Sequence, residues 1–477
     1  MPFVIPLSKQ GEPLSRQIYL WLRRAILEGA LHADERLPST RDLAEQLRVS
    51  RTVVLLAYDQ LLAEGFVHGR HGSGTYVSSG LGSDRPSTPG KLAKLKLSRF
   101  GAAASAAAAK VEPVRSPDSL RYDFSYRRPP VERFPFETWQ RILTRRSRNA
   151  PIRMLDYASP EGSIDLREAI ASHLRRSRAV VCDASQVIIV NGSQQALDLA
   201  SRVLLERGDH AVIEDPHYLG ARDTFGAAGA ILHAVPVDEE GLDPAQLPKR
   251  ARLAFVTPSH QFPTGTILPV SRRLALLDWA KRTGAVIIED DYDGEFRYEG
   301  RPVESMQGLD AEGRVIYVGT FSRTIFPALR IGYLIAPQGL VPVLTAAKRL
   351  SDRHTATLEQ ETLAEFITSG AYERHLRRSR RVNSLRRQAL LEAIDKCLGD
   401  RVEITGDESG AHVVLWPRKR VSEEEIIASA GTHGVGIYGI SRYFLKRPRR
   451  AGWMLGYARM KEEDIREGIR RLASVLG

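Results

Sequence analysis

The feature that most restricts the fold is an alternation of short apolar runs with longer helical segments in the middle of the chain. The runs are rich in β-branched residues, and most of the segments between them are long enough for a crossover helix. Parallel strands need such crossovers, so the pattern predicts an α/β domain with a largely parallel sheet. The expected strands are Val187–Val190, Ala211–Glu214, Leu253–Thr257, Val286–Glu289, Val315–Gly319 and Ile331–Ala336.

The chain is too long for a single hydrophobic core. Its 477 residues exceed the roughly 250–300 residues at which single cores stop growing, so at least two folding units are expected. Hydrophobic residues make up 43% and charged residues 26%, a mix typical of soluble globular proteins. No apolar run approaches the roughly 18 residues of a membrane span, and the first residues lack a signal pattern. We therefore expect a cytoplasmic protein with no membrane association.

Net charge and cysteine content indicate which partners and cross-links the chain can have. The net charge of +12 suits contact with a polyanion, although charge alone does not distinguish nucleic-acid-binding proteins from other basic proteins. The two cysteines, Cys182 and Cys397, lie far apart and have no partner histidine cluster. Neither a disulfide framework nor a metal site is predicted.

Residues 10–78 have the pattern of a small helical unit followed by a β-hairpin. Apolar residues recur at helical spacing between Leu14 and Ala25. Ser39 and Ser50 are good N-caps for two further short helices, and a tight turn joins these helices as in a helix-turn-helix. Residues 66–77 place apolar residues on either side of a Gly-rich turn, which predicts a hairpin wing.

Polar residues stand at the positions of this unit that would face DNA. In a helix-turn-helix the second helix enters the major groove, and Arg51 opens that helix. Arg41 begins the preceding helix, where it can pair with a phosphate or a guanine edge, and His71 stands at the wing tip. Each alone is an ordinary surface residue. In this order they predict a DNA interface of Ser39, Thr40, Arg41, Arg51, Thr52, Arg70, His71 and Gly72.

The segment from Pro13 to Val77 resembles the winged helix-turn-helix of the GntR family of regulators. The resemblance covers the whole unit and implies a double-stranded DNA operator as partner. It rests on the strings Leu37-Pro38-Ser39-Thr40-Arg41-Asp42-Leu43-Ala44, Val49-Ser50-Arg51-Thr52-Val53, Tyr58-Asp59-Gln60-Leu61 and Glu64-Gly65.

A change of composition separates this unit from the rest of the chain. Residues 79–118 are rich in Gly, Ser, Pro and Ala with scattered Lys and Arg, and they have too few large apolar residues for a core. We expect a flexible linker there, with some helix in the Ala-rich stretch. Residues 119–477 are expected to form the α/β domain, and their last hundred or so residues mix helices and strands as in a smaller subdomain.

Three motifs of the α/β domain point to a phosphate and a ring nitrogen. Residues 191–195, Asn-Gly-Ser-Gln-Gln, follow a strand and open a helix, whose N-terminus favours an anion. The acidic run 289–293 follows another strand, at the edge where α/β sites form, so that a buried acid there can hold a pyridine nitrogen. Ser322 and Arg330 flank a bend at Pro327 and offer a hydroxyl and a guanidinium to a phosphate.

These positions together resemble the fold-type I aminotransferases, with a large and a small subdomain, and the fusion to a GntR-type head resembles the MocR (GabR-like) regulators. The resemblance extends from about Tyr122 to the C-terminus and includes the specific string at residues 256–265, Val-Thr-Pro-Ser-His-Gln-Phe-Pro-Thr-Gly. It implies a pyridoxal 5'-phosphate pocket. The implied contacts are Ser193, Gln194, Ser322 and Arg330 to phosphate, Asp290 to the pyridine nitrogen, Tyr292 to the ring hydroxyl, Tyr218 stacked on the ring and Arg459 to a substrate-type carboxylate.

Two residues depart from the pattern of the enzymes. The family places its Schiff-base lysine after Thr-Phe-Ser, where this chain has Arg323. A guanidinium stays protonated and is not a usable amine nucleophile, so covalent capture of the cofactor and transamination are not expected. Phe262 stands where catalytic aminotransferases usually have an Asn against the ring hydroxyl.

The sequence thus predicts a homodimeric transcription regulator with a non-catalytic ligand sensor. The expected effector is an amino acid or a B6 vitamer: pyridoxal phosphate bound without a covalent bond, another vitamer, or an adduct of the cofactor with an amino acid. Two alternatives stay open: a pyridoxal phosphate-dependent aminotransferase with residual activity, and a repressor that senses a different anionic effector.

Overall fold

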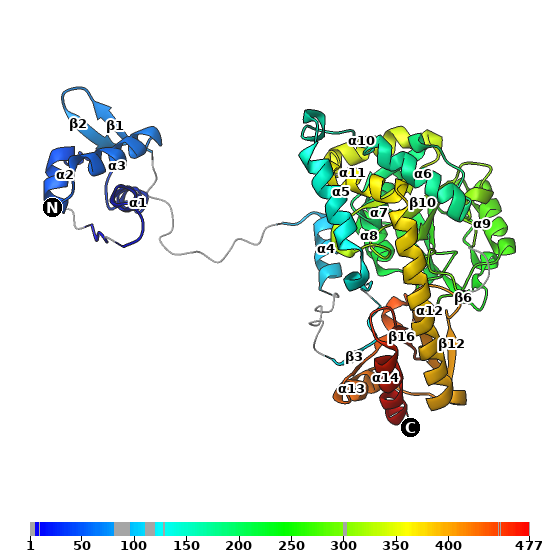
Figure 1. Cartoon of the computed structure of the whole chain (residues 1–477). Coiled ribbons are helices and arrows are strands. Elements are labelled where there is room, and N and C mark those ends of the chain that lie inside the picture. Colours follow the sequence, from blue (N-terminus) through cyan, green and yellow to red (C-terminus); the bar gives the residue numbers. More distant parts are fainter. Residues whose placement is uncertain are drawn as a thin grey trace. The chain divides into compact units, whose positions relative to one another are not determined.

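The computed structural model describes residues 5–8, 10–80, 96–109, 120–126, 129–298, 303–446, 448 and 450–476. The chain divides into two compact units, Met1–Lys96 and Leu97–Gly477 (Figure 1). No helix in these described ranges is long and apolar enough to cross a membrane.

The first unit contains three helices and a hairpin. The elements are α1 (Leu14–Leu27), α2 (Thr40–Leu47), α3 (Arg51–Ala63), β1 (Val67–Arg70) and β2 (Gly74–Val77). The side chain of Ser39 accepts a hydrogen bond from the amide of Asp42 and so caps α2, whereas Ser50 occupies the N-cap of α3 without such a bond. Arg48 ends α2 in the left-handed conformation, with φ of 53°. The predicted helix-turn-helix and wing are confirmed, around a core of Ile18, Leu22, Leu43, Val54 and Leu61.

An eight-stranded mixed sheet forms the centre of the second unit. Its order is β4 (Val187–Val190), β11 (Gly332–Ile335), β10 (Val315–Thr320), β9 (Val286–Asp291), β8 (Leu253–Val256), β5 (His210–Asp215), β6 (Ile231–Asp238) and β7 (Gly241–Leu242). Neighbouring strands from β10 to β6 are parallel, while β11 is antiparallel to both its neighbours. All six predicted strands are present. β6 was not predicted, because most of its side chains are only half-buried and it lacks a continuous apolar run.

Helices cover both faces of this sheet because alternate residues of a strand point to opposite sides. Val187 and Ile189 of β4 pack with α6 and α11, whereas Ile188 and Val190 pack with α7 and α8. The helices are α5 (Phe136–Arg148), α6 (Ile164–Arg178), α7 (Ser193–Leu204), α8 (Leu219–Ala228), α9 (Val270–Thr283), α10 (Val341–Asp352) and α11 (Thr357–Thr368).

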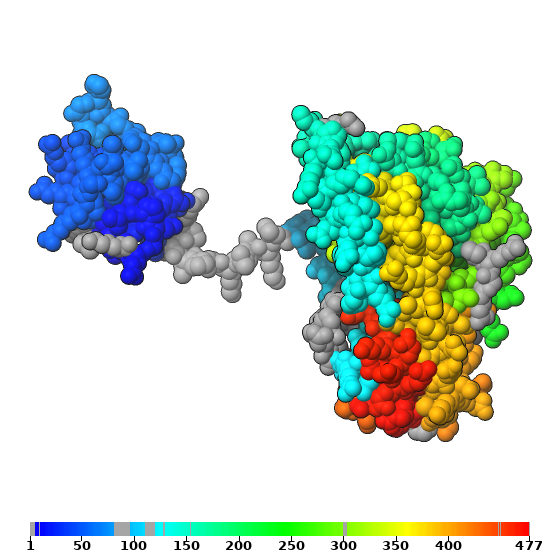
Figure 2. Space-filling model, in the orientation of Figure 1, coloured from blue at the N-terminus to red at the C-terminus, as the bar shows by residue number. Residues whose placement is uncertain are grey.

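A smaller subdomain, built mostly from the chain after the long helix α12 (Ala371–Cys397), contains a four-stranded antiparallel sheet. Figure 2 shows α12 at the surface, running from the helices around the large sheet to this subdomain. Its core includes Phe124, Leu415, Trp453, Ile465 and Leu472. The elements are β12 (Val402–Thr405), β13 (His412–Pro417), β15 (Tyr438–Gly439) and β16 (Trp453–Gly456) in one sheet, β14 (Val435–Gly436) paired with β3 (Tyr122–Asp123), and the helices α13 (Glu423–Thr432) and α14 (Glu462–Val475).

Short 3-10 helices complete the second unit. They are η1 (Val131–Arg133), η2 (Ile152–Met154), η3 (Ala184–Gln186), η4 (Pro244–Gln246), η5 (Gln307–Leu309), η6 (Pro327–Leu329), η7 (Gln338–Leu340), η8 (Gly399–Arg401) and η9 (Ser441–Tyr443).

Part of the predicted linker, at residues 81–95 and 110–118, lies outside the described residues. The Ala-rich stretch between these parts forms α4 (Arg99–Ala108), which Ser98 caps through its side chain. α4 belongs to the second unit, where it lies against α8.

A buried ion pair joins α6 to the central sheet. Arg178 Nε lies 2.6 Å from Asp291 Oδ2, and the two side chains are only 3% and 4% exposed. Arg178 also donates to the hydroxyl of Ser259, and the Tyr317 hydroxyl donates to Asp291. The pair is therefore fully hydrogen-bonded in the interior, where an unpaired guanidinium would be strongly unfavourable.

Replacing Asp291 by Ala leaves Arg178 buried without its counter-ion. We expect the substitution to lower the free energy of unfolding of the full chain by about 3–5 kcal/mol, measured by urea denaturation. Asp198→Ala is the matched control, since it removes a carboxylate that pairs with Arg202 on the exposed side of α7. The control should cost less than about 1 kcal/mol, and equal losses in the two variants would contradict this account.

Candidate functional site

The first unit brings the predicted residues of the helix-turn-helix together on its surface. Ser39, Arg41, Arg51 and Thr52 are exposed, and Thr40 is half-buried. Arg51 Nε donates to Thr40 Oγ1 at 3.3 Å, which joins the start of α3 to the start of α2. The Ser39 hydroxyl accepts from an amide of α2, so its role in this structure is a cap.

The hairpin places Arg70, His71 and Gly72 at its exposed tip. Gly72 has φ of 70°, a backbone conformation that favours glycine in a tight turn. Arg70 is held within the unit, because its guanidinium forms an ion pair with Asp34 at 2.7 Å and stacks on the Tyr76 ring at 4.7 Å.

Two apolar side chains of α3 are exposed that the sequence analysis did not single out. Leu55 and Leu56 are 44% and 55% exposed. Val54, Ala57 and Leu61 lie at helical spacing and are buried, so the helical period leaves Leu55 and Leu56 outside the core.

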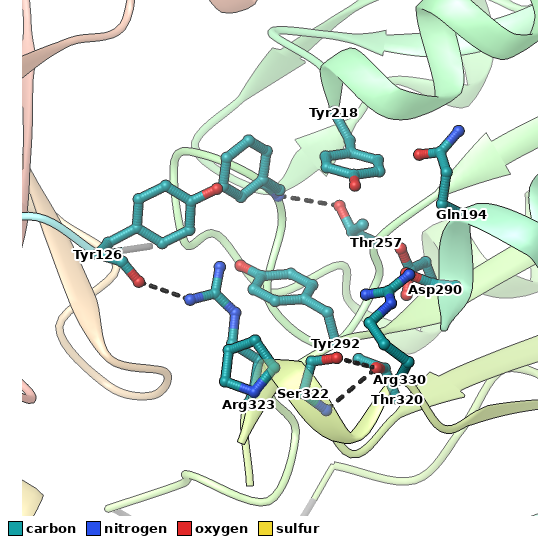
Figure 3. Close-up of a pocket in the computed structure, with 13 residues that line it drawn as sticks. Tyr126, Gln194, Tyr218, Thr257, Asp290, Tyr292, Thr320, Ser322, Arg323 and Arg330 are labelled. Carbon is teal, nitrogen blue, oxygen red and sulfur yellow. Dashed lines mark hydrogen bonds between the residues drawn. The ribbon is translucent and has the colours of Figure 1, made fainter. Parts of the chain in front are cut away.

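A cavity of about 220 Å³ opens at the carboxyl edge of the large sheet (Figure 3). The seven residues predicted to contact the cofactor line it together with Arg323, although they come from four separate parts of the sequence. The lining residues are Tyr126, Ser193, Gln194, Tyr218, Thr257, Phe262, Asp290, Tyr292, Thr320, Ser322, Arg323, Pro327 and Arg330.

One end of the cavity has the features of an anion site. α7 begins at Ser193 directly after Gly192, whose φ of 83° turns the chain into the helix. A Cβ at Gly192 would lie 2.9 Å from Arg330 Nη2, so only glycine lets the guanidinium approach the helix start this closely. Arg330 donates to the carbonyl of Asn191 at 2.7 Å. The helix N-terminus, this guanidinium and the Ser322 hydroxyl together favour a phosphate.

The wall of the cavity also contains a buried carboxyl group. Asp290, near the end of β9, is 5% exposed, and Oδ1 has no hydrogen-bond partner among the described residues. Burial, and next the neighbouring charges of Asp291 and Asp293, raise the pKa of Asp290 to about 8. Such a carboxylate requires either a proton or a donor from a ligand.

Aromatic rings form the remaining walls. Tyr218 precedes α8 and stacks on Phe255, and Phe262 meets the rings of both Tyr218 and Tyr292 edge-on. The backbone amide of Phe262 donates to Thr257 Oγ1 at 2.9 Å, which fixes the loop that follows β8. These walls suit a flat ring between the anion site and the carboxyl group.

Arg323 is turned toward Tyr126 (Figure 3). Its Nη1 donates to the Tyr126 carbonyl at 2.5 Å, and its guanidinium carbon lies 4.6 Å from the centre of the Tyr126 ring. Among the described residues that line the cavity there is no lysine. The cavity wall therefore offers a fixed cation at this position and no amine.

Sequence reasoning did not single out Tyr126, Thr320 or Pro327 as lining residues. Tyr126 belongs to a segment without regular structure, and no motif in the sequence marked it. Arg459 is not among the residues that line this cavity, and its Nη2 lies 3.6 Å from Glu132 Oε1.

Comparison with known proteins agrees with this two-part architecture. Residues 14–77 match the bacterial regulatory proteins of the gntR family, and residues 133–472 match aminotransferase class I and II. The probable rhizopine catabolism regulatory protein MocR of Rhizobium meliloti is 39% identical, over 97% of this chain and 93% of that protein.

Two further comparisons cover the regulators and the solved enzymes. The pyridoxine biosynthesis transcriptional regulator PdxR of Corynebacterium glutamicum is 31% identical, over 95% of this chain and 96% of that protein. The kynurenine aminotransferase of Pyrococcus horikoshii, solved with PMP, has a TM-score of 0.71 and 27% identity, over 80% of this chain and 95% of that one. The fold expected from the sequence, a fold-type I aminotransferase domain with an N-terminal winged helix-turn-helix, is confirmed. The chain thus belongs to the MocR-type regulators of the GntR family, in which a DNA-binding helix-turn-helix is joined to an aminotransferase class I and II domain.

Proposed function

We propose that this chain is a transcription regulator whose second unit binds a phosphorylated B6 vitamer without a covalent bond. The observation that carries the proposal is a cavity whose wall combines an anion site with the unpartnered carboxyl Oδ1 of Asp290. A pyridine ring with a phosphate arm presents complementary groups to both features. The name of the PdxR relative connects a protein of the same architecture with B6 metabolism.

Different lining residues would contact different parts of the vitamer. The start of α7 at Ser193 and Gln194, with Ser322 and Arg330, would hold the phosphate. A protonated pyridine nitrogen would supply the donor that Asp290 lacks. The Tyr292 hydroxyl would meet the ring hydroxyl, and Tyr218 would stack on the ring.

Arg323 makes the bound ligand an effector rather than a catalytic cofactor. Bound pyridoxal phosphate supplies an electron sink for amino-acid chemistry in enzymes of this fold. Those enzymes need a lysine amine, which bonds to the cofactor and transfers protons. In this chain the guanidinium of Arg323 hydrogen-bonds to the Tyr126 carbonyl and cannot act as that amine. We therefore propose that transamination is absent and that the vitamer is held by contacts alone.

An amino-acid part of the effector would need a carboxylate partner. The guanidinium of Arg459 is 31% exposed and pairs with Glu132 of η1. We propose that an effector carboxylate replaces Glu132 at Arg459, since both would present the same charge to the guanidinium. This exchange would free η1 when the effector binds.

A route from the cavity toward the DNA-binding unit begins at Tyr218. α8 starts at the next residue, and α4 lies against α8. α4 is the first described helix after the DNA-binding unit along the chain. Ring contacts at Tyr218 would shift α8 and α4 together, and so alter the chain that leads to the helix-turn-helix.

We further propose that the regulator works as a homodimer in the cytoplasm, where its DNA is. Ile152, Leu155 and Tyr157 are 84%, 78% and 74% exposed in one short segment. Such a concentration of exposed apolar side chains is typical of a protein interface. Two copies would present two winged heads to the half-sites of one operator.

The raised pKa of Asp290 makes the stability of the ligand-free chain sensitive to pH. The pKa of about 8, against an ordinary 3.8, means that the folded chain keeps a proton that the unfolded chain releases between about pH 4 and pH 8. The contribution of Asp290 to the free energy of unfolding therefore falls as pH rises through this window and levels off above about pH 8. The melting temperatures are measured without ligand and in the presence of a chelator. As the pH is raised from 5 to 8, the melting temperature of the wild type should fall relative to that of Asp290→Asn. A constant difference between the two proteins would contradict this expectation.

Restoring the amine tests whether the pocket is intact. Arg323→Lys and the wild type receive pyridoxal phosphate and then borohydride, and covalent pyridoxyl label is measured by mass spectrometry. We expect label at position 323 of the variant and none on the wild type, because only the variant has a nucleophilic amine in the cavity. No label on either protein would refute the B6 pocket. Label on both would show that another lysine serves the site and would favour an aminotransferase.

Arg51 tests the DNA interface. The DNA probe is a duplex that the full-length wild type selects from random sequences. Arg51→Ala should weaken binding to this duplex roughly 5–150-fold, because Arg51 is the first residue of the helix that enters the major groove. The control Arg24→Ala removes an exposed arginine that pairs with Glu28 on α1. Binding is measured by fluorescence anisotropy at fixed salt. Losses of similar size in both variants would indicate only a general effect of charge.

A further inference from the structure

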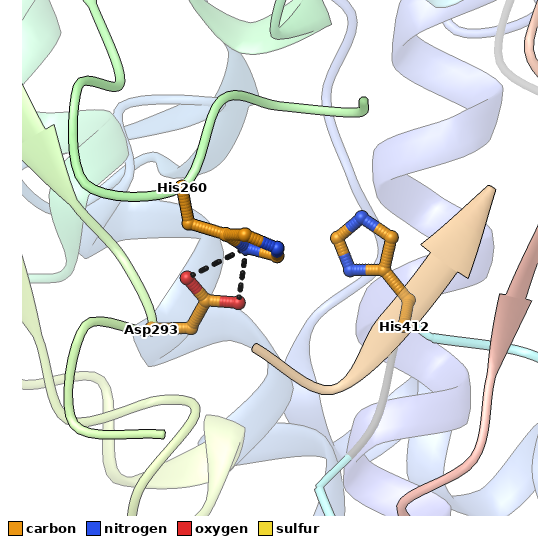
Figure 4. A group of neighbouring side chains, drawn as sticks. All are labelled: His260, Asp293 and His412. Carbon is orange, nitrogen blue, oxygen red and sulfur yellow. Dashed lines mark hydrogen bonds and ion pairs between the residues drawn. The ribbon is translucent and has the colours of Figure 1, made fainter. Parts of the chain in front are cut away.

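A second group of polar side chains lies beside the cavity and plays no part in the proposed vitamer contacts. His260, Asp293 and His412 are all buried, and one ligand atom of each lies within 4.8 Å of the others. His260 follows β8, Asp293 follows β9 and His412 begins β13 of the small subdomain. Figure 4 shows the two imidazole rings turned toward one another, with Asp293 beside His260.

The hydrogen bonds of His260 fix which nitrogen carries its proton. Nδ1 lies 3.0 Å from Asp293 Oδ2 and 2.9 Å from the Tyr292 hydroxyl. Because an ionised carboxylate can only accept, we assign the proton to Nδ1, which then donates to Asp293. Nε2 is then left with a lone pair. This nitrogen is buried and has no hydrogen-bond partner among the described residues.

His412 is arranged in the same way from the other side. Nε2 lies 2.9 Å from the Pro263 carbonyl, which can only accept, so Nε2 donates and Nδ1 keeps a lone pair. Nδ1 is also buried and unpartnered within the described part of the chain.

We propose that His260 and His412 bind a divalent transition-metal ion of the Zn²⁺ type through these two free nitrogens. Each ring donates its other N–H to an oxygen acceptor, which is the arrangement that orients histidine ligands in metal sites. Imidazole nitrogens prefer ions such as Zn²⁺, Ni²⁺ and Cu²⁺ over Mg²⁺ and Ca²⁺. The sequence gave no metal-ligand spacing because the residues come from three distant segments.

The charges around the two rings are compatible with a cation. Asp293 supplies a carboxylate next to His260, whereas the guanidinium of Arg323 opposes a positive charge at His412. A water molecule that donates to the lone pairs of His260 Nε2 and His412 Nδ1 would interact with them less strongly than a divalent cation would. The carboxylate makes the site depend on Asp293 for affinity as well as for the orientation of His260.

The ion would connect the two parts of the second unit. His260 belongs to the large subdomain and His412 to the small one. Gly410 of the small subdomain already packs against His260 and Asp293 of the large one, since a Cβ at this glycine would lie 2.7 Å from Asp293 Oδ2. Bound metal would therefore hold the two subdomains in the arrangement seen here. This proposal does not require that a vitamer binds.

Metal titration of the full chain tests the proposal. Protein treated with chelator and desalted is titrated with Co²⁺, followed by its visible spectrum, and with Zn²⁺ by calorimetry. We expect about one equivalent of tight binding in the wild type, at least a 100-fold loss in His412→Gln and a roughly 10–100-fold loss in Asp293→Asn. Absence of stoichiometric binding in the wild type would overturn the proposal.

His210→Asn is the matched control. His210 and His233 form the other close imidazole pair in the described structure, with ring nitrogens 2.5 Å apart on β5 and β6. Binding that survives His412→Gln but disappears in His210→Asn would assign the metal to that pair and refute the proposal. If His412→Gln does not fold by circular dichroism, X-ray absorption of the Co²⁺-loaded His210→Asn variant decides: scattering from two imidazoles supports the site, and scattering from fewer refutes it.

Discussion

The convergence of parallel strands at one edge of the large sheet is the constraint on which the cavity depends. β8, β9 and β10 end side by side, with Val256 opposite Glu289 and Val318 opposite Asp290. Residues that follow each strand therefore meet although they are far apart in the chain. The same burial that builds the sheet removes water from Asp290 and raises its pKa. A ligand that donates a hydrogen bond to Asp290 would offset the unfavourable free energy of burying this carboxyl group without a donor.

Arg323 contributes a guanidinium to the wall of this cavity. Its guanidinium contacts both the carbonyl and the ring of Tyr126, a residue of the segment that follows the predicted linker. Under the proposed function, Arg323 occupies the position of the enzymes' lysine and is hydrogen-bonded to the protein's own backbone instead. We propose on this ground that the cavity serves recognition rather than turnover.

The sequence predicted what depends on local pattern and missed what depends on tertiary packing. Continuous apolar runs identified six strands, whereas the half-buried β6 had no such run. The lining residues within motif strings were predicted together, because each motif follows a strand. Tyr126 and the facing of His260 and His412 could not be predicted, since they depend on how the small subdomain packs against the large one. Arg459 was expected at the site from resemblance alone, and its partner in the structure is Glu132.

The most direct test of the account compares two ligands on the unmodified chain. Pyridoxal phosphate and pyridoxamine phosphate share the ring and the phosphate but differ in the group that a lysine would capture. Calorimetric titration should give similar dissociation constants for the two, within about threefold, because every proposed contact is to the shared part. Binding of pyridoxal phosphate that is a hundredfold tighter would show covalent capture, and binding of neither would contradict the central claim.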